Sequence, residues 1–202
     1  MFTPMISVLK EGQKGSAVLS VVEVNGFLSA MSSLKGQYCP EGKYMALRVN
    51  KVLMMSDTNF EQNSNYEVVR KSQGSVLIAG LGLGMIVLPI AKKPEVTEIL
   101  VIEKYQDVID LVLPQLLKAL GPDAHKLKVI CADILKWAPP KGETWDVIYF
   151  DIWPDLCTDN LTEMATLHRR FSRRKKVWMG SWARKLLQAQ ARQDARQRYH
   201  WR

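Results

Sequence analysis

The stretch DVIYFDIWPD, residues 146–155, places two carboxylates and an indole directly after an apolar run. Asp151 ends the run, and Trp153 and Asp155 follow it. A carboxylate can orient or deprotonate a reacting group, and an indole can line a pocket or stack on a cation. We predict a catalytic role for Asp151 and substrate contacts for Trp153 and Asp155. Asp155 could instead cap a helix that begins near residue 158.

Three glycines follow another apolar run, in VLIAGLGLGM at 76–85. Gly80, Gly82 and Gly84 permit a tight turn and the close approach of a ligand to the backbone. The spacing differs from the dinucleotide fingerprint, and the absence of a following Gly-Lys-Ser/Thr excludes a phosphate-binding P-loop. The sequence therefore predicts a ligand-binding loop at 80–84, with Leu83 inside it.

Acidic residues close two further apolar runs. Glu103 ends EILVIE, 23 residues after Gly80, where a carboxylate can accept both hydroxyls of a ribose. Asp133 follows KLKVIC, where it can accept a hydrogen bond from an adenine amino group or cap a helix. We expect their neighbours Lys104 and Ile134 to belong to the same cofactor site.

Helices are expected to alternate with these apolar runs. Strands apolar on both faces that alternate with helices indicate a parallel sheet covered on both sides, so we predict an α/β, Rossmann-like, doubly wound and mostly parallel fold. Ligands in such folds bind beyond the carboxyl ends of the strands, where the four motifs would meet. The expected strands are 75–80, 98–103, 126–133, 145–151 and 175–182, and the expected helices are 83–92, 105–120, 158–172 and 182–199.

The predicted core spans 74–182 and has a segment on either side. Residues 1–73 are expected to form a small β-rich appendage, with strands at 16–25 and 44–56, a hairpin turn at 49–52 and a short helix at 59–72. Asp57 or Asn59 is the candidate N-cap of that helix. Residues 183–202 are expected to form a basic C-terminal helix or tail.

The composition is ordinary for a globular protein: 47% of the 202 residues are hydrophobic, and three cysteines are widely spaced. Neither the cysteines nor the three histidines have metal-ligand spacing, so no metal is expected. The uncharged run at 76–91 is shorter than the roughly 20 residues of a membrane-spanning helix and contains three glycines. With no recognisable signal peptide, the sequence predicts a cytoplasmic protein without a membrane segment.

Positive charge is concentrated at the C-terminal end. Residues 168–202 contain 12 Lys or Arg and one acid, which leaves 16 basic and 19 acidic residues in the rest of the chain. Such a segment can contact a polyanion such as a nucleic acid, although a solvated helix would have the same composition.

The glycine loop AGLGLG at 79–84, Glu103, Asp133 and the strand WDVIYFD together resemble class I S-adenosylmethionine-dependent methyltransferases. The resemblance implies S-adenosylmethionine as cofactor and transfer of its methyl group to an acceptor, either a small molecule or a nucleic acid. Asp151 would lie beside the cofactor and would orient or deprotonate that acceptor.

A narrower resemblance is to spermidine synthases, because the hairpin and the helix containing Tyr66 precede the glycine strand. It implies decarboxylated S-adenosylmethionine, aminopropyl transfer to a polyamine, and Tyr66 and Asp155 near the substrate. The chain departs from that family at Leu83, where the family has an Asp, and in the spacing from Asp151 to Asp155. Methyl transfer is therefore the leading prediction, and a catalytically degenerate binding module is a further alternative. The N-terminal strands could also pair in a homodimer.

Overall fold

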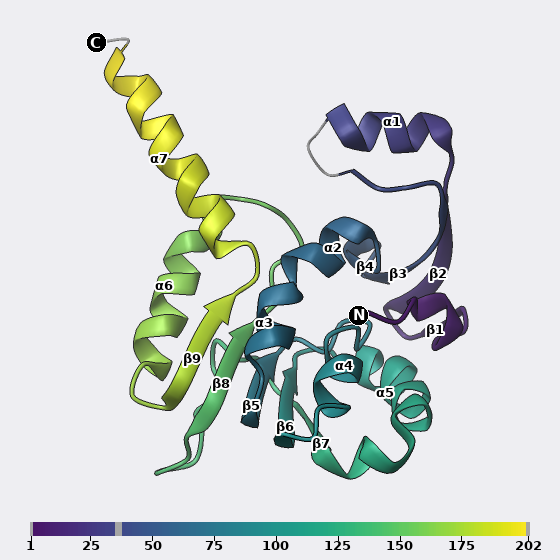
Figure 1. Ribbon diagram of the computed structural model, residues 1–202, viewed down its shortest axis with the longest axis vertical. Coiled ribbons are helices and arrows are strands. Elements are labelled where there is room, and N and C mark those ends of the chain that lie inside the picture. Colours follow the sequence, from purple (N-terminus) through teal and green to yellow (C-terminus); the bar gives the residue numbers. More distant parts are fainter. Residues whose placement is uncertain (1, 35–37, 201–202) are drawn as a thin grey trace.

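Two sheets organise the protein, and the computed structural model describes residues 2–34 and 38–200 (Figure 1). An N-terminal antiparallel sheet has the order β1-β2-β3-β4, and a parallel sheet has the order β7-β6-β5-β8-β9. The α/β class and the parallel core are therefore confirmed. The strands are β1 (Gly12–Lys14), β2 (Ala17–Val24), β3 (Gly42–Val49), β4 (Val52–Ser56), β5 (Gly74–Ala79), β6 (Val96–Glu103), β7 (Leu127–Cys131), β8 (Trp145–Phe150) and β9 (Lys175–Ser181).

The chain enters the parallel sheet at its central strand, β5. From β5 the chain adds β6 and β7 on one side and then returns to add β8 and β9 on the other. The strand order thus reverses between β5 and β8. In doubly wound sheets this switch point, at the carboxyl ends of the strands, is where a crevice opens for a ligand.

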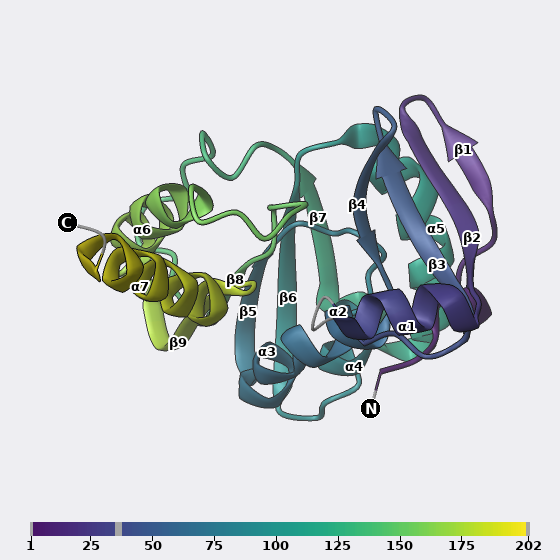
Figure 2. The same ribbon diagram turned by 90° about the horizontal axis from the view of Figure 1, so that it is seen from above.

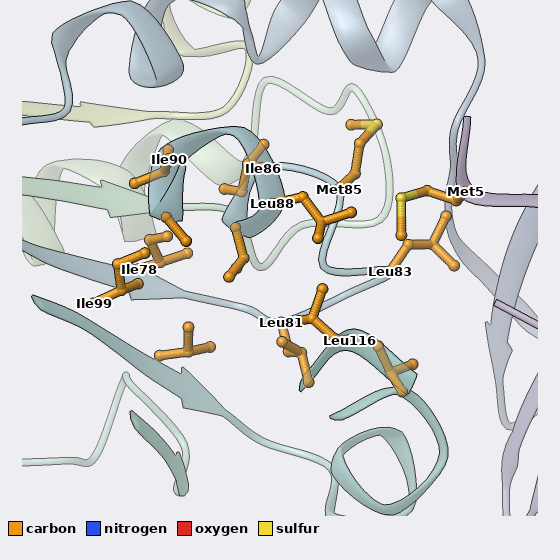
Figure 3. Packing of buried hydrophobic residues seen from close by; sticks show 14 of the residues in the cluster. Met5, Ile78, Leu81, Leu83, Met85, Ile86, Leu88, Ile90, Ile99 and Leu116 are labelled. Atoms are coloured by element: carbon orange, nitrogen blue, oxygen red, sulfur yellow. The ribbon is translucent and has the colours of Figure 1, made fainter. Parts of the chain in front are cut away.

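Both faces of the parallel sheet are covered, which explains its nearly continuous apolar strands. On one face Val76 and Ile78 belong to a cluster with residues of α4 and α5. Figure 3 shows Ile78 in this cluster with Ile90 of α4 and Leu116 of α5. On the other face Leu77 and Ala79 pack in a second cluster with α6. The longer helices are α1 (Gly26–Leu34), α5 (Gln106–Leu120), α6 (Asn160–Phe171) and α7 (Arg184–His200), and the shorter ones are α2 (Asn59–Ser64), α3 (Tyr66–Lys71) and α4 (Val87–Ala91), with 3₁₀ turns at Met5–Ser7 and Gly121–Lys126.

The N-terminal sheet packs beside α5 (Figure 2) and shares a hydrophobic cluster with the parallel sheet. Its β3–β4 hairpin turns at Asn50 and Lys51, whose φ angles of 50° and 66° suit the two-residue turn that the sequence predicts. Because residues such as Leu19 and Leu47 join the same cluster as Val76, the predicted division at residue 73 passes through a continuous core.

Several local predictions are wrong in instructive ways. Asp57 does not cap a helix, because its buried carboxylate accepts the backbone N–H groups of Met5 at 2.5 Å and Met45 at 2.6 Å. The helix expected at 59–72 breaks at Asn65 into α2 and α3. The helix expected at 83–92 begins only at Val87, because the glycine loop occupies the residues before it.

Two helices extend from the body at opposite corners (Figure 1). The sequence did not predict α1, which has no buried residue. The basic helix α7 was predicted: Leu187 packs against the second cluster, and the rest of the helix projects away from the sheet. In the described part of the chain, no helix combines the length and the apolar character needed to cross a membrane.

Candidate active site

A pocket of about 430 Å³ opens beyond the carboxyl ends of β5, β6 and β8, at the switch point of the sheet. It brings together residues from Leu47 to Glu163, which are 116 positions apart in the sequence. The sequence-predicted residues that line it are Gly80, Gly82, Glu103, Lys104, Asp133, Ile134, Asp151 and Trp153.

The glycine loop requires glycine at two of its positions. Gly80 has φ = 97°, and a Cβ atom there would lie 2.1 Å from the carbonyl oxygen of Asp151. Gly82 has φ = 52°, and its Cβ atom would lie 2.1 Å from the sulfur of Met55. Both positions are therefore closed to a side chain, and the backbone itself forms this edge of the pocket.

The N-terminal sheet supplies the wall facing the glycine loop. Met55 on β4 lies over Gly82, and its sulfur accepts the N–H of Leu83 at 3.1 Å. The wall also includes Leu47, Val49, Val52 and Met54. Sequence reasoning placed this hairpin before the glycine strand but did not assign its side chains to the site.

Glu103 links the glycine loop to the end of β6. Its Oε2 accepts the N–H of Leu81 and its Oε1 accepts the N–H of Tyr105, both at 2.8 Å. Burial raises the pKa of this carboxyl, and the two N–H donors oppose that effect. A carboxylate can accept about four hydrogen bonds, so each oxygen keeps capacity for a ligand hydroxyl.

Asp133 follows β7 on the adjoining side of the pocket. Its Oδ1 accepts the N–H of Leu135 at 3.0 Å, and its Oδ2 lies 3.6 Å from the ammonium nitrogen of Lys104. The carboxylate thus organises a turn in the manner of a cap and also lines the pocket, while Ile134 is buried beside it. The two interpretations of Asp133 from the sequence are compatible.

Asp151 lies where β8 ends, and its carboxyl is largely desolvated. This burial raises its pKa to about 7. Glu61 on α2 is a second carboxyl in this region, with a pKa raised to about 8 by burial and by the charge of Asp151. A pKa near neutrality suits a general base. No sequence pattern points to Glu61, because it lies in a polar segment 90 residues before Asp151.

Trp153 is buried in the pocket wall, where its indole N–H donates to Glu163 Oε2 at 2.8 Å. This bond holds the ring against α6, and Glu163 itself lines the pocket. The position agrees with the expected wall, although the residue's own partner is protein rather than ligand.

Four of the predicted site residues do not line this pocket. Leu83 and Gly84 are buried beneath the loop; the Leu83 side chain lies close to Met5 (Figure 3). Tyr66 is 61% exposed on α3, and Asp155 is exposed and accepts a bond from the Asn160 side chain at 3.2 Å. Within the described residues, no group of three or more His, Cys, Asp or Glu could hold a metal.

Comparison with protein-family models finds no match, and neither does comparison with curated proteins. Among solved structures, spermidine synthase from Thermotoga maritima is similar, with 18% identity, a TM-score of 0.49 and coverage of 84% of this chain and 54% of that chain. The CcbJ methyltransferase from Streptomyces caelestis has 15% identity, a TM-score of 0.44 and coverage of 57% and 44%. The chain thus spans about half the length of these structures.

Proposed function

We propose that this protein is an S-adenosylmethionine-dependent methyltransferase whose acceptor is held at Asp151. The observation that carries the proposal is the convergence of Gly80, Glu103, Asp133 and Asp151 on one pocket. The glycine offers bare backbone, and the three carboxylates can accept hydrogen bonds from hydroxyl and amino groups of a ligand. An adenosyl cofactor has hydroxyl groups on its ribose and an amino group on its adenine, and it can be recognised through them.

The residues fit that cofactor at three points. The glycine loop presents bare backbone to the pocket at Gly80 and Gly82. Glu103 would hold the ribose hydroxyls with its remaining acceptor capacity, and Asp133 and Ile134 would contact the adenine. When bound, S-adenosylmethionine supplies a methyl group carried by a sulfonium.

Asp151 would position the acceptor and take up its proton. With a pKa of about 7, the carboxyl is partly ionised near neutral pH and can both accept and release a proton. The buried indole of Trp153 lines the same space and limits access of water. Orientation of the acceptor by these side chains would supply most of the protein's contribution, because aligned reactants avoid a large entropic cost.

Aminopropyl transfer is less well supported. Leu83, at the position where spermidine synthases have an Asp, is completely buried, and the loop presents no carboxylate to an amino group there. Tyr66 and Asp155 do not line the pocket. We therefore favour methyl transfer over aminopropyl transfer.

Calorimetric titration with S-adenosylmethionine and S-adenosylhomocysteine tests the cofactor assignment. We expect saturable binding by the unmodified protein and at least a tenfold loss in Glu103→Gln, since one lost hydrogen bond to a charged group costs about 1.5–3 kcal/mol. Glu98→Gln, an exposed change on the same strand, is the matched control. Absence of binding at millimolar ligand would refute the proposal.

The group transferred can be identified before the acceptor is known. Methyl transfer leaves S-adenosylhomocysteine from any acceptor, whereas aminopropyl transfer leaves methylthioadenosine from the decarboxylated cofactor. We expect the first product when the protein is incubated with mixed metabolites or nucleic acids, and its loss in Asp151→Asn but not in Asp155→Asn. Methylthioadenosine as the product would establish aminopropyl transfer. The absence of both products would favour a binding module without catalytic activity.

A further inference from the structure

A group of arginines lies around the turn between α6 and β9, and one of them, Arg170, reaches backbone carbonyls of the pocket-lining residues Ile134 and Leu135. α6 ends at Phe171, and a short turn leads into β9, whose first residue Lys175 pairs with Trp145 at the start of β8. Asp151 follows the last residue of β8, six positions after Trp145, which corresponds to about 20 Å at roughly 3.3 Å per residue. The segment 169–176 contains six basic residues and no acid.

These arginines surround a hollow of about 590 Å³, which we call the arginine hollow. It is lined by Arg169, Arg170, Arg173 and Arg174, with Ser172 and the loop 142–144 completing its rim. Two of these arginines belong to α6 and two to the turn after it, and all four line one space. A ligand in it can contact more than one of them.

Backbone carbonyl groups hold two of the guanidinium groups in place. Arg174 donates from Nη1 to the carbonyl oxygens of Pro140 at 2.7 Å and Glu143 at 3.0 Å. Arg170 donates to the carbonyl oxygens of Ile134 and Leu135. Since a guanidinium has five N–H donors, each group keeps donors for a ligand and is already ordered before it binds.

None of these arginines forms an ion pair in the described part of the chain, although the charge of Asp133 acts on Arg170. The ion pairs recorded there involve Lys93, Lys104, Lys126 and Lys185, and none involves an arginine of the hollow. Glu143 is the one acid in the lining, and it contacts Arg174 through its backbone oxygen. With four arginines and one acid, the lining of the hollow carries a net positive charge.

The chemistry of the hollow favours phosphate over other anionic partners. The guanidinium group of arginine forms bidentate hydrogen bonds with two oxygens of a phosphate. A membrane-binding surface would also need exposed apolar or aromatic side chains beside the basic ones. The large apolar residues with the greatest exposure, Phe27 at 73% and Leu34 at 82%, are instead on α1. This helix lies far from the turn between α6 and β9 (Figure 1). Val177, 50% exposed, is the nearby exception.

We propose that the arginine hollow binds the backbone phosphates of a nucleic acid. The proposal does not depend on the cofactor pocket and stands if the proposed function fails. It also divides the basic C-terminal region into two parts, because the structure separates the hollow from the basic residues that project on α7.

Fluorescence anisotropy with labelled 20-nucleotide RNA and 20-base-pair DNA tests the proposal without any cofactor. If four phosphates are contacted, affinity should fall with a log–log salt slope of about −3 to −4. Between 50 and 200 mM salt this amounts to a loss on the order of 100-fold.

The double variant Arg169→Gln/Arg173→Gln removes two exposed arginines without disturbing the two that hold backbone carbonyls. We expect its affinity to fall at least tenfold and its salt slope to weaken by about 1.5. Arg192→Gln/Arg196→Gln, with the same loss of charge on α7, is the matched control and should change affinity less than threefold. Urea unfolding of both variants checks that the fold is intact.

Three outcomes would overturn the proposal: no nucleic-acid binding at 50 mM salt, equal loss in both double variants, or equally tight binding to polyglutamate. Tighter binding to phosphatidylserine vesicles than to nucleic acid would assign the hollow to a membrane surface instead. A loss of affinity confined to Arg169→Gln/Arg173→Gln would support the proposal. If Arg169→Lys/Arg173→Lys keeps the charge but recovers only part of the affinity, bidentate contacts of arginine with phosphate would be supported.

Discussion

Replacing Asp151 by asparagine tests the electrostatics of the pocket most directly, because the side chain keeps its shape and loses its charge. Burial raises the pKa of Asp151 to about 7, whereas an aspartate in an unfolded chain has a pKa of about 3.9. The folded state therefore holds the proton more tightly than the unfolded state does. Stability from this group is present below about pH 4 and is lost as the pH rises to about 7.

The size of the effect follows from that difference of about three pH units. At 1.36 kcal/mol per unit, the ionised carboxyl costs the folded state up to about 4 kcal/mol above pH 7. Asp151→Asn should be more stable than the unmodified protein by up to that amount at pH 8.5. At pH 5 the gain should shrink to about 1.5 kcal/mol, because the folded-state carboxyl is then protonated.

Urea unfolding followed by tryptophan fluorescence at the two pH values measures this gain. The slope of free energy against urea should be equal for the two proteins, so that a midpoint shift reports stability. Asp155→Asn, an exposed change nearby, should alter stability by less than about 0.5 kcal/mol at both pH values. A gain that does not vary with pH, or a loss of stability at pH 8.5, would refute the reasoning.

Two further predictions concern packing around the site and are also checked by urea unfolding. Gly82→Ala should cost about 1–3 kcal/mol, because its Cβ meets the Met55 sulfur and its φ is positive; Met55→Ala should relieve the steric part, and fully additive costs would contradict that contact. Asn65→Ala should cost about 1–3 kcal/mol, because buried Asn65 accepts the Tyr149 hydroxyl at 2.8 Å. Adding Tyr149→Phe should then cost little more, and an undiminished second loss would show the two residues to be uncoupled.

The parallel sheet could be predicted well because its strands are buried on both faces. A run such as WDVIYFD at 145–151 is apolar almost throughout, and β8 occupies Trp145–Phe150 of it. The helix α1 could not be predicted on the same grounds. Its apolar side chains Phe27 and Leu34 are exposed to solvent. The pattern of apolar residues in this helix therefore does not mark a buried face.

The candidate site was predictable where it is built from strand ends. Glu103, Asp133 and Asp151 could be assigned to one place because parallel strands end at a common edge of the sheet. Met55 and Glu61 could not, because each reaches the region through the folding of the N-terminal segment over the core. Within the loop, sequence spacing could not distinguish Gly82, which lines the pocket, from Leu83, which is buried below it.

The placement of Met55 over Gly82 limits how the protein can be divided or recombined. A fragment that starts at β5 would retain every strand-end acid. It would lose one wall of the pocket and the contact of Met55 with Leu83. Its newly exposed apolar surface would favour self-association. A truncated or recombined protein must therefore keep the β3–β4 hairpin together with the parallel sheet. Because hairpin side chains line the pocket, their shape must match that of the ligand.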